Sequence, residues 1–252
     1  MNTPYAIRVH DLVYQVDGKP ILKGVPFHAC SGEIVGIMGA SGSGKTTLLK
    51  CIAGLLRPTS GEIWIEEINI VPLSERAKMP LRLRLGIVFQ YAALFDFLTV
   101  YENIAFGLER HRKLPRSAID RVVQERLAWV GLEGTESLYP SQLSGGMRKR
   151  VGLARALALD PRMVLFDEPT SGLDPANAYQ IDRLIRRLNR ELGLTAVVVS
   201  HDVNSLFRTT DRIVVLDEGQ VVAEGTPEAI RQSDHPKIQA FLRMASAETL
   251  DE

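Results

Sequence analysis

The chain has 252 residues, of which 45% are hydrophobic, and this is enough to build one large or two small domains around a real core. Its 30 lysines and arginines are balanced by 30 aspartates and glutamates, so no overall basic field is present to hold nucleic acid. Two cysteines, which we expect to be buried thiols, are too few for a disulfide framework or a metal cluster, and no apolar run reaches the roughly 18 residues that span a bilayer. We therefore expect a soluble, cytosolic protein that does not bind nucleic acid.

Short β-type segments alternate with helical patterns along the chain. Strands are predicted over residues 33–38, 85–89, 163–166 and 195–200. Such alternation favours a largely parallel α/β sheet. Between about residues 91 and 160 the pattern is mainly helical, which predicts a helical insertion into the α/β core. We expect a single domain over residues 1–252, with a core at about 1–90 and 161–252 and a helical lobe at about 91–160.

The strand over 33–38 is followed by a glycine-rich loop and a helix that begins near Thr47. The loop reads Gly39-Ala40-Ser41-Gly42-Ser43-Gly44-Lys45-Thr46. This spacing, between a strand and a helix, matches the phosphate-binding loop G-x-x-x-x-G-K-[ST]. Its backbone N–H groups can surround phosphate oxygens, while Lys45 reaches the β- and γ-phosphates and the Thr46 hydroxyl coordinates Mg²⁺. Residues 39–47 are therefore predicted to bind ATP with magnesium.

The strand over 85–89 is followed by Gln90 and then by an apolar segment. The apolar residues of this segment are Ala92, Ala93, Leu94, Phe95, Phe97 and Leu98. So much apolar surface beside a phosphate site suggests a groove for the helix of a partner protein. Alternatively, the same residues form the core of the helical lobe, and the sequence does not divide them between the two roles.

Two amphipathic helices are predicted further along the chain. The first runs from about residue 117 to 130, with Ser117 and Asp120 as a capping box. The second is opened by Asp174-Pro175 and stopped by Gly193, and its apolar residues repeat at intervals of three and four. Each helix should pack one face on a core. The last residues, 245–252, are expected to be a frayed tail.

The strand over 163–166 is an apolar run that ends in two carboxylates, Asp167 and Glu168. Asp167 is placed to hold the magnesium shell. Because side chains alternate along a strand, Glu168 should point to the opposite face, where it can polarise the water that attacks the terminal phosphate.

The segment Leu143-Ser144-Gly145-Gly146-Met147 resembles the signature motif of the ATP-binding cassette (ABC) family, and residues 171–174 resemble its D-loop. The similarity extends from about Tyr14 to Gly225. It implies the fold of a P-loop NTPase, with a RecA-like core, an antiparallel β-subdomain and an inserted helical subdomain. It also implies that Ser144, Gly145 and Gly146 of one subunit contact the γ-phosphate held by the other, so that hydrolysis requires a head-to-tail pair of identical chains.

Four single residues take a role from the same resemblance. Gln90 resembles the Q-loop glutamine that touches the metal and its water, and His201, after the strand over 195–200, resembles the switch histidine that contacts the γ-phosphate. Tyr14 resembles the aromatic residue that stacks on adenine, although it could instead be a packed strand tyrosine. Asp174 belongs to the D-loop and is also a natural N-cap before Pro175, and both roles can coexist.

The residue at position 147 is methionine, where most of the family has glutamine, and methionine cannot donate a hydrogen bond. This variant, together with residues 89–96 and 235–242, resembles the ATPase subunits of the Mla or MCE lipid-trafficking systems. The resemblance implies a permease in the inner membrane, attachment at its cytoplasmic face, and MCE-type lipid-binding and small accessory subunits. The main alternative is the ATPase subunit of an importer for amino acids or another polar solute.

Two further classes of function compete with a transporter. Soluble cassette proteins that act on ribosomes or DNA generally carry two cassettes or a long coiled-coil insertion, and this sequence has neither. A scaffold that binds ATP without turnover would not need Lys45, Asp167, Glu168 and His201 together. A transporter ATPase is therefore the leading hypothesis.

Overall fold

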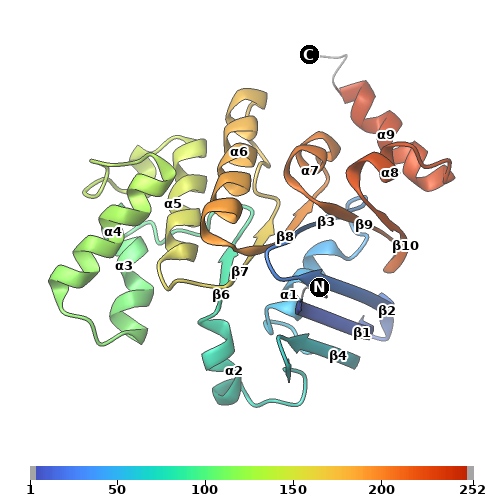
Figure 1. Ribbon diagram of the computed structural model, residues 1–252, viewed down its shortest axis with the longest axis horizontal. Helices are drawn as coiled ribbons and strands as arrows, with labels where there is room; N and C mark the ends of the chain where they lie inside the picture. Colours follow the sequence, from blue (N-terminus) through green and yellow to red (C-terminus); the bar gives the residue numbers. More distant parts are fainter. Residues whose placement is uncertain (1–3, 249–252) are drawn as a thin grey trace.

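The computed structural model describes residues 4–248, with side chains placed up to residue 243 (Figure 1). Ten strands and ten helical segments follow one another within this range. The strands are β1 (Tyr5–Val16), β2 (Lys19–Cys30), β3 (Ile34–Met38), β4 (Ser60–Ile65), β5 (Ile68–Asn69), β6 (Leu85–Val88), β7 (Met163–Asp167), β8 (Thr195–Ser200), β9 (Arg212–Asp217) and β10 (Gln220–Gly225). The helices are α1 (Lys45–Ile52), α2 (Glu75–Arg82), α3 (Val100–His111), α4 (Arg116–Val130), the 3₁₀ turn η1 (Pro140–Gln142), α5 (Gly145–Leu157), α6 (Pro175–Leu192), α7 (Val203–Thr209), α8 (Pro227–Arg231) and α9 (Pro236–Glu248).

The strands form two sheets. The six-stranded sheet has the order β10-β9-β3-β8-β7-β6, and all its pairs are parallel except β9 with β10. The four-stranded sheet has the order β2-β1-β4-β5 and is antiparallel throughout. This confirms the predicted α/β class, including the antiparallel sheet.

The central strands β3, β7 and β8 of the larger sheet are buried on both faces, which accounts for their nearly continuous apolar sequences. In β7, Val164 and Phe166 contribute to the core beneath the helices, whereas Met163 and Leu165 face a second core that includes α1 and the antiparallel sheet. The same alternation occurs in β3 and β8. The P-loop helix α1 therefore lies at the junction of the two sheets, and the ends of β3, β7 and β8 are held rigidly beside it.

Helices α3, α4 and α5 lie between β6 and β7 in the chain and gather on one side of the molecule, while α6 and α7 cover the central strands (Figure 1). The N-terminus of α6 is capped by Asp174, whose Oδ1 accepts from Asn177 N at 3.0 Å, and its C-terminus ends at Gly193 with φ 64°. The predicted boundaries of this helix are therefore confirmed. Within residues 4–248, none of the helices combines the length and the apolar character of a membrane span.

Several local expectations are wrong. Helix α4 begins at Arg116 after Pro115, and no side chain caps it; Ser117 already lies inside its first turn, and Asp120 accepts a hydrogen bond from the Tyr101 hydroxyl at 2.6 Å instead. Cys51 is buried, but Cys30, at the end of β2, is only half-buried. Residues 245–248 belong to α9 rather than to a frayed tail, and 249–252 lie outside the described residues.

Candidate functional site

The phosphate-binding loop fills the connection between β3 and α1. A Cβ on Gly39 would lie 2.1 Å from the Leu216 carbonyl oxygen, so no other residue fits there without moving the backbone. Gly44 has φ 103°, a conformation that strongly favours glycine, and it leads into α1 at Lys45. These two glycines hold the loop close to the sheet and turn it into the helix.

Lys45 lies at the centre of this loop. Its Nζ donates to the carbonyl oxygens of Gly39 at 2.7 Å and Ala40 at 2.8 Å, and only 6% of the residue is exposed. Burial lowers the pKa of Lys45, although Glu168 and Asp167 act in the opposite direction. The Ser43 hydroxyl, in the same loop, is buried and has no hydrogen-bond partner among the described residues. A buried ammonium and a spare hydroxyl suit a phosphate group, which would supply oxygen acceptors to both.

A cavity of about 510 Å³ opens above the loop. Its lining residues come from β2, the loop, α1, and the ends of β6, β7 and β8: Ile21, Ser41, Gly42, Gly44, Lys45, Thr46, Thr47, Gln90, Glu168 and His201. Many of the residues predicted for nucleotide binding and catalysis thus meet at one cavity, of a size that accommodates a small-molecule ligand.

Asp167 and Glu168 reach different partners; Glu168 lines the cavity, whereas Asp167 does not. The Thr46 hydroxyl donates to Asp167 Oδ1 at 2.8 Å, so two oxygen groups suited to magnesium lie side by side. Glu168 Oε2 lies 2.8 Å from His201 Nδ1 and 3.4 Å from Ser200 Oγ. The predicted reason for their divergence is wrong, however, because β7 ends at Asp167 and Glu168 has φ 51°. A backbone turn, rather than strand alternation, aims the second carboxylate.

These residues fit a magnesium ion only with help from the nucleotide. No group of three His, Cys, Asp or Glu that could hold a metal occurs in the described part of the chain. The available oxygens belong to Thr46, Asp167 and the half-buried Gln90, so phosphate oxygens and water would complete the shell, as magnesium prefers.

Lys149 connects the segment after β6 to the segment after β7, and it was not predicted from the sequence. From α5, its buried Nζ donates to the carbonyl oxygen of Glu168 at 3.1 Å and to that of Gln90. Burial lowers its pKa to about 8. A lysine three residues after Gly146 and four before Leu153 occupies an inward position of an amphipathic helix, and that spacing was the available signal.

The signature and D-loop residues lie apart from this cavity and close to one another. Ser144 caps α5, and its Oγ accepts from Met147 N at 3.2 Å. A Cβ on Gly146 would lie 3.4 Å from the side chain of Asn177, which follows the N-cap Asp174 in the first turn of α6. Ser144, Gly145, Gly146 and Asp174 do not line the cavity. Met147 is half-buried and packs against the core beneath the helices, so at this position the side chain is used for packing.

Tyr14 is also absent from the cavity wall. It lies half-buried on β1, paired with Leu22 of β2, and packs against the core that includes α1. Ile21, which precedes Leu22 on β2, lines the cavity instead and was not predicted. The sequence indicated this residue only by its position, which is N-terminal to the first predicted strand at 33–38.

The apolar segment after Gln90 is divided between the two roles that the sequence left open. Ala92 is buried, and Leu94 packs against the core beneath the helices. Tyr91 and Phe97 are 82% and 77% exposed, and the ring of Phe97 lies 5.8 Å from that of Phe95. An exposed aromatic surface therefore remains beside the glutamine that lines the cavity.

Comparison with known proteins places these features in a family. Residues 22–171 match the family model described as "ABC transporter". The ATP-binding protein MlaF of the intermembrane phospholipid transport system of Haemophilus influenzae is 42% identical over 94% of this chain and 90% of its own length. The methionine import ATP-binding protein MetN of Carboxydothermus hydrogenoformans is 42% identical over 88% of this chain and 66% of its own length.

A solved structure is similar in both sequence and fold. It is a dimeric ATP-binding cassette in a post-hydrolysis state bound to ADP and Pi, with 35% identity and a TM-score of 0.81, covering 88% of this chain and 98% of the other. The likeness spans both sheets and most of the helices described above.

Proposed function

Because the chain belongs to the ABC transporter family and is the ATPase subunit of a transporter, we propose that it works as a pair to drive the movement of phospholipids between membranes. The observation that carries this function is the cluster of Lys45, Thr46, Glu168 and His201 at one cavity above the phosphate-binding loop, with Asp167 bonded to Thr46. These side chains are of the types that phosphoryl transfer to water uses to bind phosphate, hold magnesium and orient the attacking water.

The cluster divides the work of hydrolysis among its residues. Lys45 and the loop N–H groups hold the β- and γ-phosphates of ATP, and Glu168 takes a proton from the water that attacks the γ-phosphorus as the bond to ADP breaks. The contact of 2.8 Å between His201 Nδ1 and Glu168 Oε2 supports this assignment, since it orients the carboxylate. Thr46, Asp167 and Gln90 would hold magnesium, which supplies positive charge to the phosphate oxygens.

The second half of each site comes from a second copy of the chain. Ser144 and the N–H groups at the start of α5 form an anion site at a helix N-terminus, yet they do not line the cavity of their own chain. A head-to-tail pair would bring Ser144, Gly145, Gly146 and Asp174 to the nucleotide held by the partner. The dimeric state of the similar cassette supports this arrangement.

Phospholipid is the cargo that the comparisons favour. MlaF, which matches over 94% of this chain and 90% of its own length, serves phospholipid transport by its name, and Met147 with residues 89–96 and 235–242 resembles that branch. A methionine importer subunit is equally identical, although the match covers 66% of its length, so import of a polar solute is the second candidate.

A membrane permease is the proposed partner, with MCE-type lipid-binding and small accessory subunits beyond it. The exposed rings of Tyr91 and Phe97 support a docking place next to Gln90, through which movement of the permease would reach the metal and water. The chain would then lie at the cytoplasmic face of the inner membrane, attached through the permease.

The test is to purify the chain with its native membrane partner and to identify bound small molecules by mass spectrometry, with ATPase activity measured on the same sample. We expect co-purified phospholipid and a hydrolysis rate that depends on the permease. A bound polar solute without phospholipid would instead establish the importer.

A further inference from the structure

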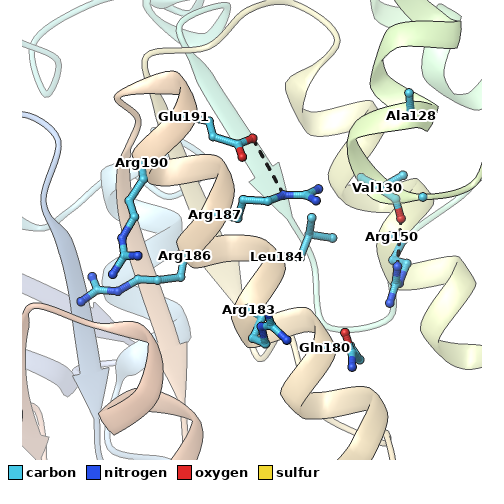
Figure 2. A pocket seen from close by; sticks show the side chains of 11 residues that line it. Ala128, Val130, Arg150, Gln180, Arg183, Leu184, Arg186, Arg187, Arg190 and Glu191 are labelled. Atoms are coloured by element: carbon cyan, nitrogen blue, oxygen red, sulfur yellow. Dashed lines mark hydrogen bonds and ion pairs between the residues drawn. The ribbon is translucent and has the colours of Figure 1, made fainter.

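A second, larger cavity of about 690 Å³ lies between α6, the C-terminal end of α4 and the middle of α5, away from the phosphate-binding loop (Figure 2). Its walls include five arginines and one carboxylate: Arg150, Arg183, Arg186, Arg187, Arg190 and Glu191. Four of the arginines come from α6 and one from α5. We call this feature the arginine cleft.

The positive charge of the arginine cleft is only partly compensated. Arg186 Nη1 lies 2.5 Å from Asp211 Oδ1, and Arg187 Nε lies 3.9 Å from Glu191 Oε2. Arg183 and Arg190 are exposed and form no ion pair within residues 4–243. Five guanidinium groups thus face two carboxylates, which leaves three positive charges in a chain whose net charge is zero.

The spacing of the arginines on α6 destabilises this helix in the absence of a bound anion. Arg183 with Arg187, and Arg186 with Arg190, are like-charge pairs four residues apart, and such pairs destabilise a helix by a few tenths of a kcal/mol each. Figure 2 shows Arg186 and Arg190 on one flank of α6 and Arg187 on the side that faces Arg150. An anion held by the arginines that line the cleft would reduce this repulsion.

The guanidinium groups of the arginine cleft favour phosphate as the ligand. Guanidinium forks match the oxygens of phosphate in pairs, and a cavity of this volume accommodates a small-molecule ligand. A terminal phosphate carries about −1.5 to −2 at pH 7, so two of them balance three positive charges, whereas the two phosphodiesters of a lipid headgroup, at about −1 each, balance two of the three.

We propose that the arginine cleft binds a small polyanion with two neighbouring phosphoryl groups, separately from the ATP cavity. Such a ligand bridges the core to the helical insertion, because Arg150 also donates to the Val130 carbonyl oxygen at 3.0 Å and Arg187 donates to that of Trp129. Both carbonyls belong to the C-terminal end of α4, and Arg150 lies on the helix that begins at the signature residues. The source of the phosphoryl groups is either a soluble diphosphate or the headgroup of a lipid with two phosphates.

The experiment uses the full chain with its phosphate-binding loop filled by a non-hydrolysable ATP analogue and magnesium. Inorganic pyrophosphate is titrated by calorimetry, and vesicles of phosphatidylcholine with or without cardiolipin are tested by co-sedimentation. The variant is Arg183→Gln with Arg190→Gln, and the matched control is Arg57→Gln with Arg76→Gln, because those two exposed arginines lie outside the cleft. Arg190→Lys keeps the charge and removes the fork.

We expect one phosphoryl probe to bind, with an affinity that falls at least about tenfold in the cleft variant, falls less in Arg190→Lys, and is unchanged in the control. Binding of pyrophosphate identifies a soluble ligand, whereas binding of cardiolipin vesicles alone identifies a lipid. If neither probe binds, or if the control loses as much affinity as the cleft variant, the proposal is wrong. ATP binding at the loop remains intact in either case, so this outcome is distinct from a failure of the proposed function.

Discussion

The ATP cavity and the signature region of this chain are built in opposite ways. In the cavity, side chains from different elements hold one another: Thr46 bonds to Asp167, and His201 contacts Glu168. In the signature region, the side chains of Ser144 and Asp174 serve as N-caps, and their hydrogen bonds within residues 4–243 stay in the first turn of their own helices. The first region is preorganised within one chain, whereas the second is a helix N-terminus outside the cavity, which we propose as the anion site for the nucleotide of a partner. Half of the catalytic machinery is therefore expected to work only on a partner.

The largest effect is expected for Glu168→Gln. The amide cannot accept the proton of the attacking water, so the hydrolysis rate should fall about 10²- to 10⁴-fold while ATP binding and dimer closure persist. Phosphate release and size-exclusion chromatography with ATP measure the two properties. A variant that hydrolyses ATP at the original rate would show that Glu168 is not the base.

Ser144→Arg tests the signature region. It should lower the hydrolysis rate about a hundredfold in the homodimer, because a bulky cation blocks the proposed anion site. Nucleotide binding should be retained. Ser74→Arg is the matched control, since Ser74 caps α2 in the same way and lies far from the signature helix in sequence. It should lose only the cap, about 1 kcal/mol of stability.

Mixing Ser144→Arg with Glu168→Gln sharpens the comparison further. If the signature acts across the dimer, the mixed pair contains one intact composite site and one doubly damaged site. ATPase activity should therefore reappear on mixing two inactive proteins. Continued inactivity of verified mixed dimers would mean that Ser144 serves the nucleotide of its own chain.

Lys149 connects the two regions, and we expect a smaller, pH-dependent effect there. Lys149→Met leaves the carbonyls of Gln90 and Glu168 without their donor and should lower the rate roughly tenfold, because both residues shift at the cavity. Since the folded-state pKa is about 8, the normal chain should lose activity as the pH rises through 8. Lys149→Arg stays charged and should remain active there.

Stability provides an independent check, because it should change in the opposite direction. Between pH 8 and 10.5 the unfolded chain keeps the Lys149 proton that the folded chain has released, so the free energy of unfolding from this group rises with pH. Denaturant titrations of the normal chain and Lys149→Met across this window measure it. If ATP hydrolysis by the normal chain and by Lys149→Arg depended on pH in the same way, the proposed role of Lys149 in the site would be wrong.

The smallest effect is expected for Tyr14→Leu. If Tyr14 stacks on adenine, loss of the ring should raise the KM for ATP about three- to tenfold and leave kcat unchanged, whereas Tyr14→Phe should behave normally. Leucine preserves most of the packing against the core that includes α1. An unchanged KM would leave Tyr14 as a packed strand residue.

Local patterns in the sequence predicted the parts of this protein that are built from neighbouring residues. The four predicted strands lie within a residue of their observed ends, and α6 begins and ends at its predicted cap residues. The phosphate-binding loop was readable because its glycines, lysine and threonine are consecutive between a strand and a helix. In such segments the backbone conformation depends on a few adjacent side chains.

Tertiary structure decided whatever joins residues far apart in the chain. Asp120 was expected to cap its own helix, but the Tyr101 hydroxyl of the neighbouring helix donates to it instead. Lys149 reaches Gln90 across 59 positions, and the arginine cleft forms only where α6 meets the end of α4 and the middle of α5. The sequence by itself therefore determined the family, the phosphate loop and the acidic pair. Only the fold decided how Glu168 is aimed, what holds it in place and where unpaired arginines converge, because those contacts depend on packing between elements rather than on the order of residues.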